Sequence, residues 1–198
     1  MLELRAVGYD HPDVAVLVAA VQREYVLRYG DEDATPVDPS EFAPPRGRFV
    51  AGYVAGEPVA CGGWRARDAV VADGAPEPGA DGSAGPPGAG PAGGDAEFKR
   101  MFVVAGHRGR GYARAVLAEL ERSAAAAGRR HAVLETGTRQ PEAMALYVGA
   151  GYVPIPPFGV YRDSPSCRCF AKPLPRTGGD DSRSVVAGSA AVAKYSPG

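Results

Sequence analysis

The chain has 198 residues and a formal net charge of −1, and its 27 glycines and 19 prolines are an unusually large share. That share is about twice the ~12% of average sequences, and such an excess can mark a low-complexity protein. Here it is concentrated in residues 68–95, with 8 Gly and 5 Pro, and in residues 175–198, with 4 Gly and 2 Pro. The rest of the chain, roughly 150 residues, is long enough to bury a core of its own.

The net charge is likewise an average over different segments. Residues 68–95 hold five acidic side chains and no Lys or Arg, the tail carries +1, and the remainder carries +3. This mild excess of positive charge excludes the strongly basic domain that is typical of nucleic-acid binding. The small positive charge of this part of the chain is compatible with binding of a small anionic ligand.

Cysteines and apolar runs bear on the compartment and on metal binding. Cys61, Cys167 and Cys169 cannot form a paired disulfide framework and lack zinc-finger spacing. The N-terminus lacks the pattern of a signal peptide, and the longest apolar run, 14–21, is shorter than the ~20 residues of a membrane span. We therefore expect a reduced, cytoplasmic protein with no membrane segment and no bound metal.

The first third of the chain predicts a strand, a helix and a hairpin. Residues 2–7 alternate apolar and polar, which is typical of a half-buried strand. Asp10 offers a helix N-cap, and helically spaced apolar residues run from there to Gly30. An acidic, proline-broken loop or short helix follows, and then a hairpin with strands at 48–54 and 58–64.

After a flexible loop at 68–95, strands and helices alternate again. A helix at about 109–127 has the best apolar stripe, with Gly128 just past its end. A second helix follows Gln140, has Pro141 at its first position and ends at Gly151. We expect strands at 96–104, 131–136, 152–155 and 168–172, and a disordered tail from 175.

The most informative stretch is a strand, a glycine-rich turn and a helix. The strand residues Met101, Phe102 and Val103 precede the turn Arg108-Gly109-Arg110-Gly111-Tyr112-Ala113. Glycines between a strand and a helix N-terminus let backbone N–H groups approach an anion closely, and the helix dipole favours negative charge there. The pattern therefore predicts a phosphate-bearing ligand.

Two nucleotide-binding motifs fail at this turn. A P-loop needs Lys and a hydroxyl residue after its second glycine, where this chain has Tyr112 and Ala113. A dinucleotide fingerprint needs a third glycine where Arg114 stands. A glycine turn without any ligand is the remaining alternative, and a nucleotide-binding module is disfavoured.

This stretch resembles the GCN5-related N-acetyltransferase (GNAT) superfamily. The family's pyrophosphate loop reads Arg/Gln-x-x-Gly-x-Gly/Ala, and Arg108, Gly111 and Ala113 match it in place. The resemblance covers about residues 2–174 and is closest over 96–152, where the helix with Leu146-Tyr147 stands at the family's position.

The resemblance implies the fold and the co-substrate. We expect an α/β (α+β) GNAT fold, with a mixed, mostly antiparallel sheet of six to seven strands and about four helices. Its strands would splay apart at the acetyl-CoA site, and 1–174 would be one domain. Acetyl-CoA would bind, without a metal, to Met101, Phe102, Val103, Arg108, Gly109, Arg110, Gly111, Tyr112, Ala113 and Gln140, where the family usually has Asn.

The resemblance also implies two catalytic residues. Glu97 would be the general base, and by period two it would share a strand face with Val103. Tyr147 would be the general acid that protonates the leaving thiolate. A backbone N–H around Phe102 or Val103 would meet the oxyanion. The alternatives are an exposed carboxylate that pairs with Lys99 or Arg100, and an ordinary core tyrosine.

The activity expected from these residues is acetyl transfer from acetyl-CoA to a primary amine of a small molecule, peptide or protein, in a ternary complex. The alternative is a non-catalytic acyl-CoA sensor or interaction module on the same fold. Acidic residues at 31–41 favour a cationic amine, unless they are merely solvated. Homodimers are frequent in the family, so the resemblance also allows a homodimer.

Overall fold

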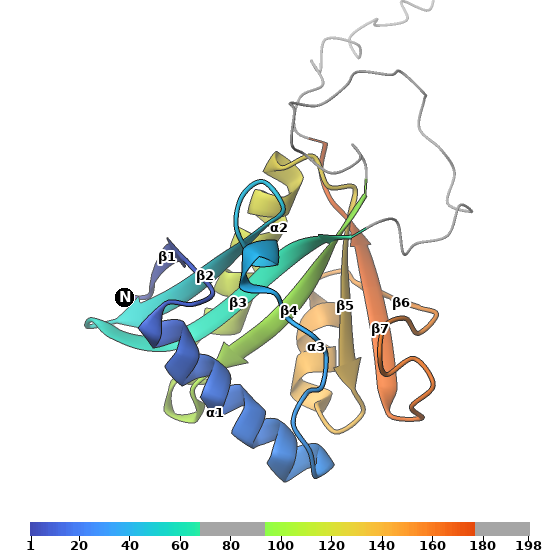
Figure 1. Cartoon of the computed structure of the whole chain (residues 1–198), viewed down its shortest axis with the longest axis horizontal. Helices are drawn as coiled ribbons and strands as arrows, with labels where there is room; N and C mark the ends of the chain where they lie inside the picture. Colours follow the sequence, from blue (N-terminus) through green and yellow to red (C-terminus); the bar gives the residue numbers. More distant parts are fainter. Residues whose placement is uncertain (68–93, 177–198) are drawn as a thin grey trace, which may run out of the picture.

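The computed structural model describes residues 1–67 and 94–176. There, seven strands form one sheet in the order β1-β2-β3-β4-β5-β7-β6, in which only the β4–β5 pair is parallel (Figure 1). This mixed, mostly antiparallel sheet confirms the expected fold class. The strands are β1 (Glu3–Val7), β2 (Gly47–Val54), β3 (Glu57–Arg67), β4 (Asp95–Val103), β5 (His131–Gly137), β6 (Val153–Ile155) and β7 (Cys167–Pro173).

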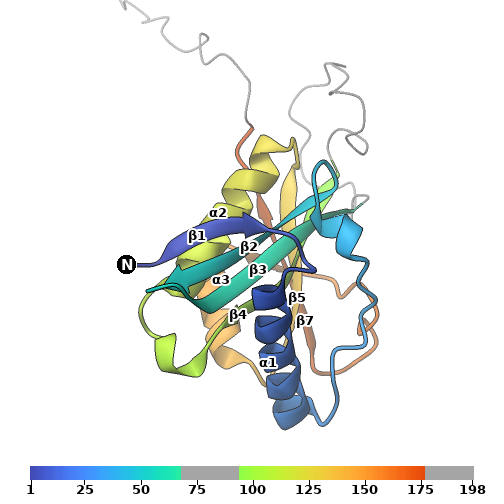
Figure 2. The same ribbon diagram turned by 60° about the vertical axis from the view of Figure 1, so that its left-hand side comes forward.

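Helices cover both faces of the sheet. The described residues form the α-helices α1 (Pro12–Tyr29), α2 (Tyr112–Ala126) and α3 (Pro141–Gly149), and the 3₁₀ turns η1 (Pro39–Phe42) and η2 (Ala105–His107). Figures 1 and 2 show α1 and η1 on one face, and α2 and α3 on the other. No helix of the described part is long and apolar enough to cross a bilayer.

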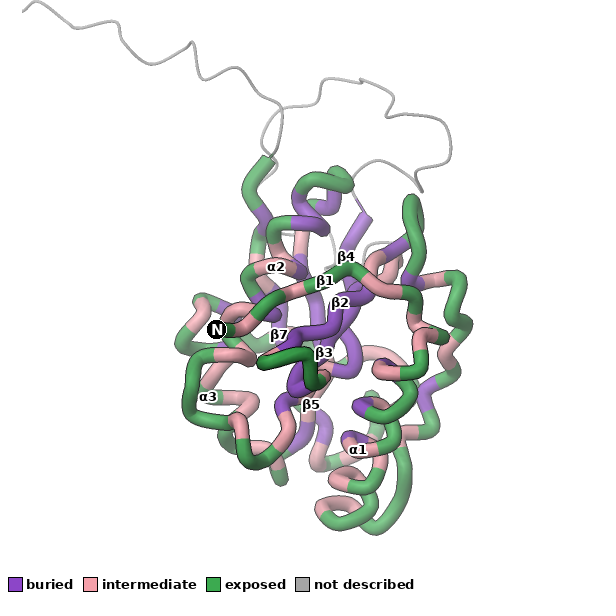
Figure 3. The backbone as a smooth tube through the Cα atoms, turned by 90° about the vertical axis from the view of Figure 1, so that its left-hand side faces the viewer, coloured by how far each residue is buried: buried purple, intermediate pink, exposed green. Residues whose placement is uncertain are grey.

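Each face has its own apolar cluster, as the two-sided burial of a central sheet requires. On the α2 face, Val116 and Leu120 pack with Phe98 and with Trp64, whose indole N–H donates to Ser123 Oγ at 2.9 Å. On the α1 face, the cluster includes Val14, Leu17, Phe42 and Phe49. The central strands are accordingly buried through most of their length (Figure 3).

The ends of the helices follow the expected chemistry, with two corrections. The N-cap of α1 is His11, whose Nδ1 accepts from the Asp13 N–H, and not Asp10. Helix α2 begins at Tyr112 and not at 109, because Gly111 is its N-cap in the left-handed region at φ 80°. Gly128, at φ 76°, follows the other end of α2 as expected.

Strand β4 carries a β-bulge at Arg100. Arg100 has φ 58°, and the β3–β4 register shifts between Cys61 and Gly63. A bulge adds one residue to a strand and so reverses the alternation of faces beyond it. Phe98 and Val103 therefore pack into the same cluster although they are five residues apart. Glu97 faces the other way, so the expectation that it shares a face with Val103 is wrong.

The expected flexible loop at 68–95 lies outside the described residues except at its end. Asp95 belongs instead to β4, is buried, and pairs through Oδ1 with His131 Nδ1 at 3.0 Å. The expected disordered tail also lies outside the described residues, apart from Pro175 and Arg176.

Residues 68–93 are expected to be dispensable for folding, because Arg67 and Asp95 are direct register partners in the β3–β4 pair. Replacing 68–93 with an Asn-Gly turn should leave the melting temperature within a few degrees of the wild type, since loop closure depends weakly on length. Circular dichroism during heating measures this. A Gly/Ser segment of the original length is the control, and loss of cooperative unfolding only in the shortened chain would contradict the expectation.

Candidate functional site

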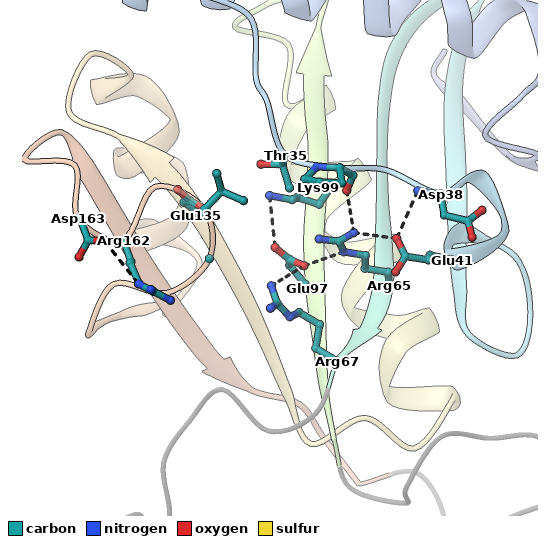
Figure 4. A pocket seen from close by; sticks show the side chains of 13 residues that line it. Thr35, Asp38, Glu41, Arg65, Arg67, Glu97, Lys99, Glu135, Arg162 and Asp163 are labelled. Atoms are coloured by element: carbon teal, nitrogen blue, oxygen red, sulfur yellow. Dashed lines mark hydrogen bonds and ion pairs between the residues drawn. The ribbon is translucent and has the colours of Figure 1, made fainter.

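Two neighbouring hollows open on the α1 face of the sheet. The first has a volume of about 650 Å³ and lies between η1, the N-terminal part of β4 and the β6–β7 loop (Figure 4). The second, about 320 Å³, lies between the C-terminal part of α1, β5 and the same loop. Thr35, Lys99 and Glu135 line both.

The hollows meet where β4 and β5 separate. These strands pair only from Ala96 and Ala132 as far as Phe98 and Leu134. Lys99 and Glu135, the next residues of each strand, therefore stand on the two sides of the opening. Beyond them, β4 pairs with β3 alone and leaves its other edge without a strand partner in the described chain. This is the splay that the sequence led us to expect.

Glu97 lies in the first hollow at the centre of a cluster of three cations. Its side chain is 1% exposed, and it accepts from Arg65 Nε at 2.7 Å and from Arg67 Nη1 at 3.1 Å. Lys99 Nζ lies 3.3 Å from its other oxygen. Burial would raise the pKa of Glu97, but Lys99 and the arginines outweigh it and hold that pKa below its ordinary value. Figure 4 shows both oxygens facing these cations.

Glu135 is the other carboxylate of the opening, and its surroundings are different. It forms no ion pair within residues 1–67 and 94–176, and the Cys167 thiol donates to its Oε1 at 3.5 Å. Burial raises the pKa of Glu135 above its ordinary value, and Lys99 offsets this only in part. The pKa of Glu97 is thus lowered and that of Glu135 is raised. Such opposite shifts in neighbouring carboxylates are typical of sites where the two groups have different roles in proton transfer.

Tyr147 lies on the α2 face, behind the opening. It is 6% exposed and packs with Tyr152 and Phe170, at centroid distances of 5.7 and 6.3 Å. Burial raises the pKa of its hydroxyl, which therefore stays protonated at neutral pH. Tyr147 lines neither hollow, but it lies close enough to Tyr25 of α1, in the lining of the second hollow, to add to the effect of burial in raising the pKa of Tyr25.

The turn after β4 presents unsatisfied backbone donors. Within the described residues, the amides of Gly109, Arg110 and Gly111 donate to no backbone acceptor, and no side chain caps α2. Tyr112 and Ala113 open the helix, where the first N–H groups have no acceptor in the helix itself. Four or five amides at a helix N-terminus form an anion site.

The unpaired edge of β4 adjoins this turn and is occupied by Arg108. The Nε of Arg108 donates to the Val103 carbonyl at 2.9 Å, and its Nη2 pairs with Glu24 of α1. The Val104 N–H donates to the Val59 carbonyl of β3. Because the backbone N–H and C=O groups of successive strand residues point to opposite edges, those of Met101 and Val103 point to the free edge and those of Phe102 point to β3. A further group that pairs with this edge would therefore share the Val103 carbonyl with Arg108 or displace Arg108 from it.

Helix α1 is tied to both walls of the opening through one ionic network. Glu24 accepts from Arg28 Nε at 2.9 Å as well as from Arg108, and Arg28 also pairs with Glu142 of α3. Gln140, just before α3, donates through Nε2 to the Tyr29 hydroxyl at 3.2 Å. The glycine-rich turn Arg108–Ala113, the free edge of β4 and Gln140 thus surround one opening, and α1 lies across it.

Sequence reasoning missed Glu135 and the tyrosines of α1. It named Lys99 only as an alternative partner of Glu97, and the structure shows this pair at 3.3 Å. One signal could have found Glu135, because it is the acidic residue in the otherwise apolar run Ala132-Val133-Leu134-Glu135 of a central strand. Arg65 and Arg67 had no such signal as partners of Glu97, since they belong to another strand. Among the described residues, no group of three or more His, Cys, Asp or Glu side chains is arranged to hold a metal ion.

Comparison with known proteins identifies the family of the chain. The model of the acetyltransferase (GNAT) family matches residues 15–152. A curated relative, an IAA acetyltransferase of Azospirillum brasilense, is 42% identical over 82 residues, which are 41% of this chain and 54% of the relative. The chain therefore spans about half the length of that relative.

Solved structures share the fold. The GNAT domain of S. lividans PAT has a TM-score of 0.59 at 20% identity, covering 87% of this chain and 90% of that one. A GNAT family acetyltransferase from Elizabethkingia anophelis with acetyl-CoA bound has a TM-score of 0.57 at 12% identity, covering 87% and 98%. At such identities the likeness concerns the fold alone.

Proposed function

Because the chain belongs to the GNAT family of acetyltransferases, we propose that it transfers an acetyl group from acetyl-CoA to a primary amine. The observation that carries the proposal is the run of amides without acceptors from Gly109 to Gly111, beside the unpaired edge of β4. A diphosphate matches the amides, and an extended amide-bearing arm matches the edge. The two hollows on the α1 face would hold the acceptor.

The residues that would hold acetyl-CoA fall into two groups. The backbone of Arg108–Ala113 would bind the diphosphate, with the side chains of Arg108 and Arg110 adding positive charge. Met101 and Val103 would pair with the pantetheine arm, which would share the Val103 carbonyl with Arg108 or displace Arg108 from it, and Phe102 and Gln140 would line its path. When bound, acetyl-CoA supplies an activated acetyl thioester.

Glu135, rather than Glu97, would take the proton of the attacking amine. Glu97 already binds three cations and has a lowered pKa, which makes it a weak base. Glu135 has a raised pKa and lines both hollows at the opening. As the C–N bond forms and the C–S bond breaks, Glu135 accepts the amine proton and the Tyr147 hydroxyl gives one to the leaving sulfur. Glu97 would keep Arg65 and Lys99 in place.

A pair of glycine variants tests the cofactor site. Gly111 and Gly128 flank opposite ends of α2, both have positive φ, and a Cβ would meet nothing within 4 Å at either. Valine at either position strains the backbone to a similar extent. Gly111→Val is expected to weaken acetyl-CoA binding by about tenfold or more, because it displaces the amides, each of which contributes about 1.5–3 kcal/mol to a charged acceptor.

Isothermal titration with acetyl-CoA measures the binding, and Gly128→Val is the matched control. It should lose similar stability but keep the wild-type affinity. Equal affinity of both variants for acetyl-CoA would contradict the assignment of the turn, and tighter binding of ATP than of acetyl-CoA would favour a nucleotide-binding module instead.

A further inference from the structure

The second hollow carries more negative charge than its surroundings neutralise. Four carboxylates line it, and Lys99 is its single lining cation. Lys99 pairs with Glu97 at 3.3 Å, and Asp33 pairs with the buried Arg100. The remaining carboxylates, Asp31, Glu32 and Glu135, form no ion pair with any described residue.

Aromatic rings form another part of the wall. Tyr25 and Tyr29 of α1 and Tyr161 of the β6–β7 loop line the hollow. The hydroxyls of two of them are engaged, since Gln140 donates to Tyr29 and the Ala34 N–H donates to Tyr161 at 2.6 Å. Rings fixed in this way present faces that attract cations, and they also cover methylene groups.

One buried hydroxyl in the lining of this hollow has no partner among the described residues. The Oγ1 of Thr136 forms no hydrogen bond there, whereas the Thr35 side chain interacts with the Asp33 carboxylate and, together with Arg100, holds the pKa of Asp33 below its ordinary value against the effect of burial. An unpaired buried hydroxyl is costly, so a ligand that donates to Thr136 would stabilise this wall. An ammonium group carries three N–H donors and no acceptor, which suits hydroxyl oxygens and carboxylates together.

We infer that the acceptor is a small aliphatic diamine, whose reacting nitrogen lies at Glu135 and whose second ammonium group lies against Asp31 and Glu32. This inference rests on the proposed N-acetyl transfer and names its substrate class. A volume of about 320 Å³ fits a small molecule and not a folded partner. The diamine nitrogen forms the new C–N bond, its proton goes to Glu135, and the other nitrogen stays charged.

The test compares a diamine with a monoamine of the same chain length, with acetyl-CoA saturating and release of the CoA thiol as the readout. The diamine should have the lower KM, and added salt should raise its KM more than that of the monoamine, because screening weakens the second contact. In the double variant Asp31→Asn/Glu32→Gln, the KM for the diamine should rise about 3- to 30-fold while the KM for the monoamine stays within twofold.

The control variant Asp10→Asn/Glu57→Gln changes the net charge equally at exposed residues that line neither hollow, and it should leave both KM values unchanged. Equal KM values for the two amines would overturn the inference, as would better turnover of a peptide N-terminus than of the diamine. In both cases acetyl transfer itself is retained. Absence of thiol release with every amine would instead contradict the proposed function.

Discussion

Glu135→Gln is expected to lower kcat about 10²- to 10⁴-fold, the usual contribution of a positioned general base. The amide keeps the shape of the side chain but cannot accept the proton of the amine. The affinity for acetyl-CoA should stay near the wild-type value, because Glu135 lies in the hollows of the α1 face and not in the turn that precedes α2. Thiol-release assays over a range of amine concentrations measure kcat and KM separately.

The pH profile gives this prediction a second readout. A base must be deprotonated to act, so kcat falls as the pH drops through the pKa of Glu135. Burial raises that pKa above the ordinary 4.5 of a glutamate, which moves the acidic limb of the profile to higher pH. The Glu135→Gln variant should lose this limb.

Glu119→Gln is the matched control for Glu135. Glu119 pairs with the exposed Arg122 on the surface of α2 and lines neither hollow. It should keep the wild-type kcat and the wild-type acidic limb. An unchanged kcat in Glu135→Gln would show that Glu135 is not the general base, whatever the result for the control variant.

The second large effect concerns stability. Glu97→Gln leaves Arg65, Arg67 and Lys99 facing a neutral amide in a site where the carboxylate was 1% exposed. Removing one partner from buried ion pairs typically lowers the free energy of unfolding by about 3–5 kcal/mol. Because Arg67 is one-third exposed, we expect the lower end of that range. Urea unfolding at pH 7 measures the change.

The pH dependence of stability follows from the same cluster. The folded pKa of Glu97 lies below its ordinary value, so its contribution is present above about pH 4.5 and is lost as the pH falls through the lowered pKa. Wild-type stability should therefore fall more steeply below pH 4.5 than that of Glu97→Gln. The two unfolding free energies should converge at low pH.

Glu3→Gln is the control for Glu97, because Glu3 pairs with Arg5 on the surface, where both side chains are half or more exposed. Its effect should be small by comparison. If Glu97→Gln keeps the wild-type stability but loses turnover, Glu97 is the base that the sequence predicted, and the reassignment to Glu135 is wrong.

Much of the fold could be predicted because its signals are local. The alternation at 2–7, the apolar stripe of the helix after Gly111 and the glycine that ends it each determine an element from neighbouring residues. The signal for the glycine-rich turn Arg108–Ala113 was also local, since it consists of two glycines between a strand and a helix. For these features, chain order and periodicity were enough.

The catalytic assignment depended on features that are not local. The bulge places a non-glycine residue, Arg100, at positive φ, and no composition signal marks it. That one residue reverses the face of Glu97 relative to Val103. Against the effect of burial, Lys99 of the same strand lowers the pKa of Glu97 most. Arg65 and Arg67 of β3 lower it further, and their contribution follows from strand pairing.

The most direct test of the central claim is thiol release from acetyl-CoA by the full chain over a panel of primary amines, with the acetylated amine identified by mass spectrometry. We predict release that requires both substrates, with one acetylated amine formed for each thiol released. Saturable acetyl-CoA binding with no transfer to any amine would contradict the claim, and would identify a non-catalytic acyl-CoA-binding module instead.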